Sequence, residues 1–320
     1  MKEKVVYLFE DPSMEAAILG PMNKNIKIIE ASLKCKVLIT NDSLISDEEH
    51  AEMIEKIIAI IQIFVERSQV VRERELLSII ALLKNYPLSE VEAFFHKTIT
   101  FVNTYDGRAI VAKTINQKKY YEALQTSDIV FAVGVAGSGK TYLAVSYALN
   151  LLKKNKIKKL IITRPVVEAG EKLGFLPGDL KEKIDPYLIP IYDAIHDIIG
   201  VEQADKMIEK GIIEIAPIAY MRGRTLDNAF IILDEAQNTT TNQMKMFLTR
   251  LGFNSKMVIT GDITQIDLQN KLQSGLVEAI NLLKGVNDIR FVYFTASDVM
   301  RHPLVSKIIE RYEGDQDAQN

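Results

Sequence analysis

Short apolar runs alternate with longer helical patterns from residue 129 onward. Several of these runs are apolar throughout, which is typical of strands in a sheet covered on both faces. Their alternation with helices predicts βα units around a parallel sheet, and so a RecA-like P-loop domain. The expected strands lie at residues 129–133, 160–163, 212–216, 230–233, 256–260 and 290–294. Because a doubly wound sheet binds ligands at the carboxyl ends of its strands, the chemistry is expected on the loops there.

The first seventy residues carry a different pattern, in which strands and helices are mixed. Isoleucines recur on one face of a long amphipathic helix expected over residues 47–66. Before it, the pattern predicts a strand, two helices and a second strand, at residues 5–9, 14–19, 26–33 and 36–40. The stretch after Thr40 is short for a third strand, so the expected unit is a compact βααβα arrangement. Further helical segments are expected at residues 72–83 and 89–98.

Composition is that of an ordinary globular chain and excludes several classes of protein. The 320 residues are 48% hydrophobic and carry a net charge of −3, so a nucleic-acid contact would need a local basic patch. Cys35 is the only cysteine, which excludes an intrachain disulfide and a cysteine-rich zinc site. The apolar runs are too short to span a bilayer, and the N-terminus does not resemble a signal peptide. A cytoplasmic location without membrane contact is therefore expected.

A phosphate-binding loop is expected between the first strand of the sheet and the helix after it. The sequence GVAGSGKT matches the full P-loop pattern in that context. Glycines let the backbone N–H groups wrap around phosphates, and the helix N-terminus adds positive potential. Lys140 is expected to reach the β and γ phosphates, and Thr141 to ligate Mg²⁺. The expected nucleotide-binding residues are Gly134, Val135, Ala136, Gly137, Ser138, Gly139, Lys140 and Thr141.

Two carboxylates follow a later apolar strand, in the sequence AFIILDE. This is a Walker B arrangement, in which Asp234 is expected to hold Mg²⁺. Glu235 is expected to orient and deprotonate the attacking water. A second carboxylate favours hydrolysis over simple nucleotide binding. The alternative is a helix-capping Asp-Glu pair, which the P-loop disfavours.

Two amide side chains are further candidates for the nucleotide site. Gln265 lies in a polar turn after a strand and is a candidate to hydrogen-bond both the γ phosphate and the attacking water. The alternative is an ordinary Gly-Asp turn without a role in catalysis. Gln117 precedes the first strand of the sheet, where an amide can pair with adenine N6 and N7. A position on a surface helix is the alternative for Gln117.

The densest basic run of the chain follows the P-loop helix. Its lysines are Lys153, Lys154, Lys156, Lys158 and Lys159. Such a run is often only a solvated face, and the alternative is an RNA path or a partner surface. Both interpretations stay open on sequence alone.

Residues 114–311, about two thirds of the chain, resemble the PhoH family of ATPases. The resemblance is carried in order by GVAGSGKT, LIITRPVVEAGEKLGFLPGDLKEKIDPYL, MRGRTLDNAFIILDEAQNTT, ITGDITQIDL and DVMRHPLV. The core of this family is similar to the first RecA-like lobe of superfamily 1 helicases. The resemblance implies ATP with Mg²⁺, Gln237 and Asn238 near the Walker B turn, Gln265 as a sensor, and an RNA-related role. Single-stranded RNA is the expected partner. It also suggests an endoribonuclease of the YbeY type as a partner.

The N-terminal βααβα order is similar to a KH domain, in which a Gly-containing turn clamps a nucleic-acid backbone. Here that turn is GPMNKN at residues 20–25, without the second glycine of the usual motif. A packing or assembly domain is the alternative. The expected division is therefore a KH-like α+β domain at residues 1–70, a helical connector at 71–105, a RecA-like P-loop ATPase domain at 106–313 and a flexible tail at 314–320.

A helicase motor needs two RecA-like lobes, and the stretch after residue 311 is too short for a second one. A neighbouring subunit is expected to supply the missing arginine, so a homo-oligomeric ring, a hexamer, is expected. The candidate arginine fingers are Arg222, Arg224, Arg250 and Arg301, with Arg301 taken as the catalytic candidate. An intrachain salt bridge is the alternative for each of them.

Two functions remain open on the sequence. The first is an RNA-stimulated ATPase that remodels RNA as a ring. The second is an ATP-dependent switch or adaptor that regulates a partner, such as an endoribonuclease, without helicase activity. A small-molecule kinase is disfavoured, because no acceptor pocket or lid can be located while Glu235 and Gln265 suit water activation.

Overall fold

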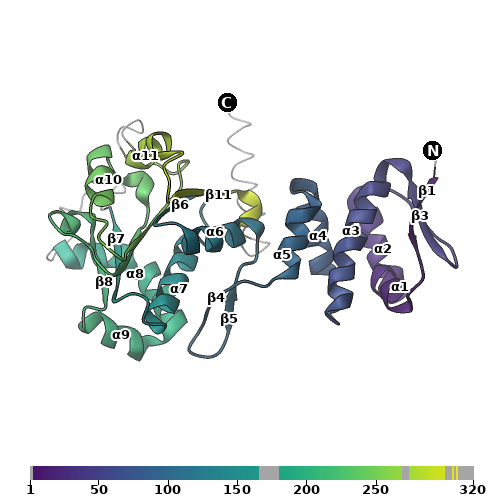
Figure 1. Cartoon of the computed structure of the whole chain (residues 1–320), viewed down its shortest axis with the longest axis horizontal. Coiled ribbons are helices and arrows are strands. Elements are labelled where there is room, and N and C mark those ends of the chain that lie inside the picture. The colour runs from purple at the N-terminus through teal and green to yellow at the C-terminus, as the bar shows by residue number, and fades with distance from the viewer. Residues whose placement is uncertain (1–2, 166–179, 269–273, 300–304, 306–307, 309–320) are drawn as a thin grey trace. The chain divides into compact units, whose positions relative to one another are not determined.

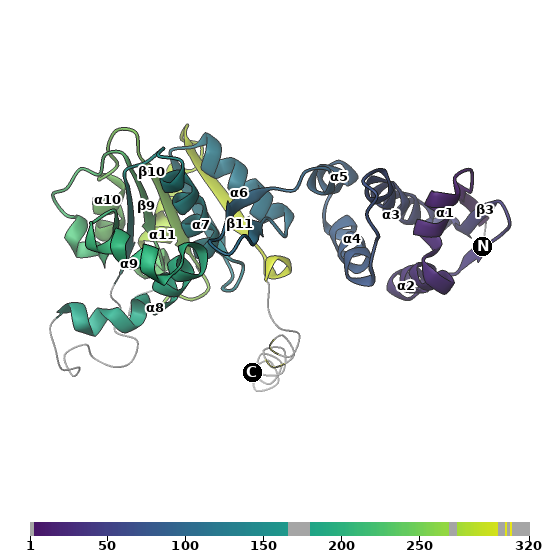
Figure 2. The same ribbon diagram turned by 90° about the horizontal axis from the view of Figure 1, so that it is seen from below.

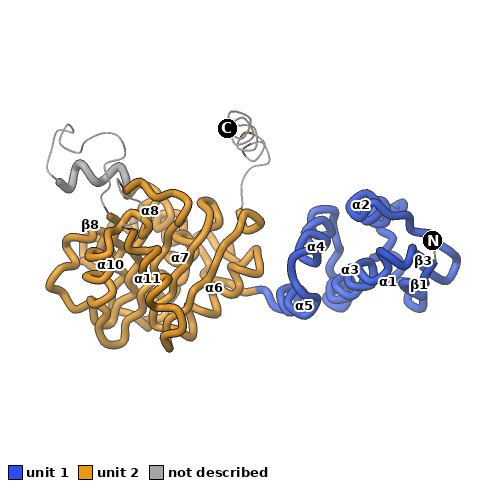
Figure 3. Tube along the Cα trace, turned by 90° about the horizontal axis from the view of Figure 1, so that it is seen from above, with its two compact units in different colours: residues 1–98 blue, residues 99–320 orange. Residues whose placement is uncertain are grey.

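The computed structural model describes residues 3–165, 180–268, 274–299, 305 and 308. The chain forms two compact units, residues 1–98 and residues 99–320 (Figure 3). Helices α4 (Glu73–Asn85) and α5 (Leu88–His96), which lie in the stretch expected as a connector, belong to the first unit. Among the described residues, no helix has both the length and the apolar content to cross a membrane.

The first unit packs helices against a three-stranded antiparallel sheet. Its elements are β1 (Glu3–Leu8), α1 (Pro12–Leu19), the 3-10 turn η1 (Pro21–Asn23), α2 (Lys24–Leu33), β2 (Val37–Ile39), β3 (Ser43–Asp47), α3 (Glu48–Glu66), α4 (Glu73–Asn85) and α5 (Leu88–His96). The sheet order is β1-β3-β2. The amphipathic face of α3 buries Ile54, Ile57 and Ile61 completely, as its isoleucine pattern predicted.

The expected βααβα order is corrected by β3, the central strand of this small sheet. Its sequence is SLISD, with polar residues at both ends and only two apolar side chains. Leu44 is fully buried and Ser46 is 2% exposed. A polar residue at a buried strand position hides the alternation from which strands are recognised in a sequence. The observed order is βααββα.

The second unit is a six-stranded parallel sheet in the order β11-β6-β10-β9-β7-β8 (Figures 1 and 2). The strands are β6 (Ile129–Gly134), β7 (Lys159–Arg164), β8 (Ile213–Pro217), β9 (Ala229–Leu233), β10 (Lys256–Gly261) and β11 (Ile289–Phe294). All six coincide with expected strands to within a residue or two. The α/β fold with a parallel sheet, consistent with a RecA-like P-loop domain, is thereby confirmed.

Helices cover both faces of this sheet, which explains its continuous apolar strands. The helices are α6 (Ile115–Thr126), α7 (Lys140–Lys153), α8 (Leu180–Ile199), α9 (Val201–Glu209), α10 (Thr241–Leu248) and α11 (Gly275–Leu283). One face packs with residues of α6 to α9, and the other with residues of α10 and α11. A hairpin of β4 (Thr100–Asn103) and β5 (Ala109–Val111) precedes α6, and 3-10 turns lie at η3 (Ile218–Met221), η4 (Ala236–Asn238) and η6 (Ala296–Asp298).

Strand order places the expected chemistry together. The P-loop follows β6, the Walker B carboxylates follow β9, and the turn with Gln265 follows β10, which lies between those two strands. Because all these strands are parallel, their carboxyl ends meet at one edge of the sheet.

Candidate active site

The P-loop connects β6 to α7 with a backbone that glycine suits. Gly134, Gly137 and Gly139 all have positive φ, at 140°, 83° and 85°. A Cβ on Gly134 would lie 2.0 Å from the carbonyl oxygen of Phe294 on the neighbouring strand. The first glycine of the motif is therefore required by the sheet as well as by the turn.

Lys140 begins α7 and folds its side chain over the loop. Its Nζ donates to the carbonyl oxygens of Gly134 at 2.7 Å and Val135 at 2.8 Å, and to Ser138 Oγ at 3.3 Å. Burial lowers the pKa of Lys140, while the nearby carboxylates, Asp262 foremost, oppose that shift. The ammonium group is thus held where a phosphate would offer it a better acceptor than neutral carbonyl groups.

The two expected Mg²⁺ ligands lie in direct contact. Thr141 Oγ1 donates to Asp234 Oδ1 at 2.6 Å, and Thr260 Oγ1 on β10 donates to the same oxygen at 2.8 Å. Hydroxyl and carboxylate oxygens are the ligands that Mg²⁺ prefers in nucleotide sites. This donor set fits the ion, with Thr141 and Asp234 as the residues that would hold it.

Glu235 follows in a left-handed conformation, with φ at 52°. Its Oε2 accepts a hydrogen bond from Gln237 Nε2 at 2.6 Å, and its Oε1 lies 3.3 Å from Arg164 Nη2. Arg164 Nη1 also lies 4.0 Å from Asp234 Oδ2. Sequence reasoning missed Arg164. A charged residue directly at the end of an apolar strand is the signal that could have found it, whereas the pairing of β7 with the Walker B strand comes from the fold.

The turn after β10 contacts both the P-loop and the Walker B turn. Asp262 Oδ2 accepts from the backbone N–H of Ala136 at 3.1 Å, and the N–H of Asp262 donates to Gln237 Oε1 at 3.0 Å. Gln237 is almost fully buried. Because its amide bonds to Glu235 on one side and to Asp262 on the other, it links Glu235 to this turn. Gln265 is exposed, and its N–H donates to the carbonyl oxygen of Asp262 at 3.0 Å.

A cavity of about 220 Å³ collects these groups. Its lining residues are Ala136, Gly137, Gly139, Lys140, Thr141, Tyr142, Asp234, Glu235, Gly261, Asp262 and Gln265. The loop, the two carboxylates and the expected sensor thus share one cavity. Of the expected residues, Gly134, Val135, Ser138 and Gln117 do not line it.

Gln117 lies under the P-loop with its amide already bonded. Its Oε1 accepts from the backbone N–H of Lys113 at 2.7 Å, and its Nε2 donates to the carbonyl oxygen of Ser138 at 3.1 Å. The side chain is buried, at 4% exposure. Gln117 therefore supports the loop in this structure, and an adenine contact would require it to exchange these partners.

The candidate arginine fingers differ in their surroundings. Arg224 forms a bidentate ion pair with Glu214, at 2.5 and 2.8 Å. Arg250 donates to the carbonyl oxygens of Arg224 and Met246. Arg222 is exposed, and Arg301 lies outside the described residues.

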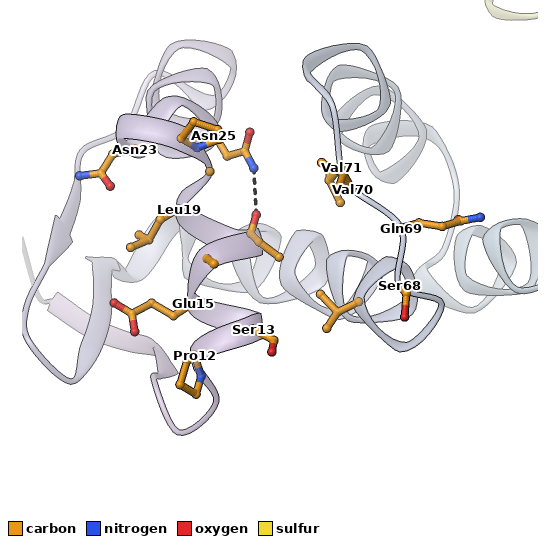
Figure 4. Close-up of a pocket in the computed structure, with 15 residues that line it drawn as sticks. Pro12, Ser13, Glu15, Leu19, Asn23, Asn25, Ser68, Gln69, Val70 and Val71 are labelled. Atoms are coloured by element: carbon orange, nitrogen blue, oxygen red, sulfur yellow. Dashed lines mark hydrogen bonds between the residues drawn. The ribbon is translucent and has the colours of Figure 1, made fainter.

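A second cavity, of about 790 Å³, lies within the N-terminal unit (Figure 4). It is bounded by α1 and the turn at residues 20–25 on one side, and by residues 65–71 on the other. Gly20 has φ at 67°, and a Cβ there would meet the Asn25 side chain at 2.6 Å. Asn25 Nδ2 donates to the carbonyl oxygen of Ala17 at 2.9 Å, which joins the two helices across the turn.

Comparison with known proteins agrees with this geometry. The family model described as PhoH-like protein matches residues 109–313. A PhoH-like protein of Bacillus subtilis (strain 168) is 46% identical over 306 residues, which cover 95% of each chain. Protein PhoH of Escherichia coli (strain K12) is 43% identical over 209 residues, covering 65% of this chain and 59% of that protein.

Among solved structures, the Sulfolobus solfataricus SWI2/SNF2 ATPase core in complex with dsDNA matches with a TM-score of 0.30 and 17% identity, over 50% of this chain and 33% of that one. This similarity is too low to carry an argument. The family match runs from β5 to residue 313, and the relative from Bacillus subtilis matches almost the whole chain. The chain is a P-loop NTPase and belongs to the PhoH-like protein family.

Proposed function

We propose that this chain is a Mg²⁺-dependent ATP hydrolase whose cycle is coupled to RNA. The observation that carries the proposal is the 2.6 Å contact between Thr141 and Asp234, beside Lys140 and in one cavity with Glu235. A bound Mg²⁺ would neutralise charge that develops on the phosphates. Lys140 and the loop N–H groups hold and orient the phosphates, and Glu235 accepts the proton of the attacking water.

The RNA part of the proposal rests on the N-terminal unit and on the resemblance of the chain. The βααββα order and the left-handed turn at Met22 and Asn23 are consistent with a KH-like unit that binds single-stranded RNA. A homo-oligomeric ring in the cytoplasm is proposed with it, in which a neighbouring subunit would supply an arginine to the candidate active site.

A second candidate function is an ATP-dependent switch that regulates a partner, such as an endoribonuclease of the YbeY type. The contacts of Glu235 favour it. Both carboxylate oxygens of Glu235 are engaged, by Arg164 and by Gln237. While Glu235 is held by these two partners, the chain is expected to hydrolyse ATP slowly, until a conformational step frees the carboxylate to act as the general base.

The test is steady-state ATP hydrolysis with and without single-stranded RNA. In the first function, RNA raises turnover of the wild type. Glu235→Gln lowers turnover by about 10² to 10⁴ while nucleotide binding is retained, since it removes the base and leaves the loop intact. Lys140→Ala is the control that loses nucleotide binding and excludes contaminating ATPases.

Slow hydrolysis that RNA does not change would favour the switch. Full activity of Glu235→Gln would contradict the role given to this carboxylate in both functions.

A further inference from the structure

Three loops meet at the amino edge of the parallel sheet, at the ends of the strands opposite to the candidate active site. They precede β7, β9 and β10, which are neighbours in the sheet. The N–H of Lys158 donates to the carbonyl oxygen of Asn228 at 2.8 Å, and the N–H of Asn228 donates to that of Phe253 at 2.9 Å. Backbone hydrogen bonds thus place Asn228 between the basic run after α7 and the loop that carries Phe253.

Phe253 is an exposed aromatic residue on a well-supported turn. It is 85% exposed, while its N–H donates to Asp227 Oδ1 at 2.6 Å. The preceding residue is Gly252, where a Cβ would come within 2.1 Å of that same carboxylate oxygen. The N–H of Gly252 donates to the carbonyl oxygen of Leu226 at 3.2 Å. The turn holds the backbone in place and presents the ring to solvent.

The lysines of the basic run are all exposed. Within the described part of the chain, Lys153, Lys154, Lys156 and Lys158 form no ion pair. Lys159 lies close to Glu214, whose pKa is lowered chiefly by the hydrogen bond from Arg224 and to a smaller extent by Lys159. Lys153 is in the last turn of α7, where a cation favours the helix by itself. Lys156 and Lys158 lie beyond the helix end, so helix stability does not account for them. Asp227, the acidic residue of these three loops, is used to hold Phe253.

We propose that this surface, the Lys–Phe edge, binds single-stranded RNA. The Lys–Phe edge is defined as Lys153, Lys154, Lys156, Lys158 and Phe253. Lysines attract phosphates without regard to sequence, and an exposed ring stacks on a base. A base can stack on Phe253 only where it is not already stacked in a duplex, which favours a single strand. This inference rests on the proposed coupling to RNA and names a second contact for it, away from the N-terminal unit.

Charge decides between RNA and a protein partner here. Four lysines that form no ion pair with any described residue complement a phosphate backbone, whereas the core of a protein interface is depleted in lysine. The edge lies at the opposite ends of the strands from the cavity with Lys140. Changes there are therefore expected to leave basal ATP hydrolysis intact.

The first measurement is binding of the full chain to a fluorescein-labelled single-stranded RNA, followed by fluorescence anisotropy without nucleotide. Phe253→Ala is expected to weaken binding about 5- to 150-fold, which is the loss of one stacked base. Phe253→Tyr keeps an aromatic face and is expected to bind as the wild type does. Loss of stacking leaves the salt dependence of binding unchanged, because no phosphate contact is removed.

The second measurement is the salt dependence of the same binding. Lys156→Gln combined with Lys158→Gln is expected to make the negative slope of log affinity against log salt concentration shallower by about 1.4, at roughly 0.7 for each phosphate contact with a single strand. Lys156→Arg combined with Lys158→Arg keeps both charges and the wild-type slope. Lys245→Gln, an exposed lysine on α10, is the matched change elsewhere on the unit.

Wild-type RNA affinity and salt slope in the Phe253→Ala and double Gln variants would overturn the proposal, as would a wild type that does not bind the RNA. Altered oligomeric state with unchanged RNA binding would overturn it as well, and would make the edge a protein contact. Reduced RNA binding in a chain whose ATP hydrolysis ignores RNA supports the edge and contradicts the proposed coupling. RNA-stimulated hydrolysis that is equal in all variants supports the coupling and contradicts the edge.

Discussion

Gly134 shows how a single residue serves both the sheet and the phosphate loop. It pairs with Phe294 in the register of β6 and β11, and its φ of 140° is one that side chains rarely adopt. A Cβ would lie 2.0 Å from the Phe294 carbonyl oxygen, which belongs to the backbone and cannot rotate away. Any substitution must therefore push β11 away from β6 or distort the loop.

Gly134→Ala is expected to lower the free energy of unfolding by at least about 2 kcal/mol, because strain and a backbone clash add together. Gly107→Ala is the matched control, since Gly107 has φ at 87° but nothing within 4 Å of the added Cβ. It should cost only the backbone strain, about 1 kcal/mol. Denaturant unfolding of the three chains measures both losses, and equal losses would contradict the clash.

Sequence reasoning located the residues of the candidate site better than their partners. Glycines, a lysine and carboxylates that directly follow apolar strands are visible as local patterns, and Lys140, Asp234 and Glu235 lie in one cavity. The contact between Ala136 and Asp262 joins residues 126 positions apart. This contact forms because β10 lies beside β6 in the sheet. The order of strands in a sheet cannot be predicted from local sequence patterns.

The Arg224–Glu214 pair connects β8 to the loop before β9. The two side chains form a bidentate ion pair and are 33% and 29% exposed. Hydrogen bonding from Arg224 lowers the pKa of Glu214 below its ordinary value of 4.5. The pair stabilises the fold while Glu214 is ionised, and that stability is lost as the pH falls through the lowered pKa.

Glu214→Gln is expected to lower the free energy of unfolding by about 1 kcal/mol at neutral pH, since partly exposed pairs contribute little. The difference from the wild type should persist from about pH 7 to about pH 5 and shrink below the ordinary pKa of 4.5. Urea unfolding across this range measures it. A difference that stays constant at low pH would show that ionisation of Glu214 is not its source.

The strands of the two units differ in how well their sequence pattern predicts them. The six parallel strands were predicted because each is rich in apolar residues, and the apolar run is continuous where both faces are buried, as in β9, where every residue is buried. β3 was missed because it buries Ser43 and Ser46 beside Leu44. A central strand that tolerates serine breaks the alternating pattern, and its pairing with β1 and β2 depends on tertiary contacts.

For the whole molecule, the proposed ring requires that a neighbouring subunit supply an arginine to the candidate active site. Arg224 and Arg250 are bonded within their own chain. Arg222 is exposed, and Arg301 remains a prediction. If a neighbouring subunit supplies the arginine, one chain needs only an intact cavity and the other needs only an intact arginine.

Mixing two inactive chains tests the ring directly. Arg222→Ala combined with Arg301→Ala keeps Lys140 and Glu235 but removes both candidate fingers, and turnover is expected to fall by about 10³ or more. Glu235→Gln keeps the arginines but lacks the base. In a ring, subunits of the two kinds sit side by side, so ATP hydrolysis is expected to recover on mixing. Restoring Arg222 or Arg301 singly then identifies the finger. A mixture no more active than its components, together with sedimentation as a monomer, would show that each chain hydrolyses ATP alone.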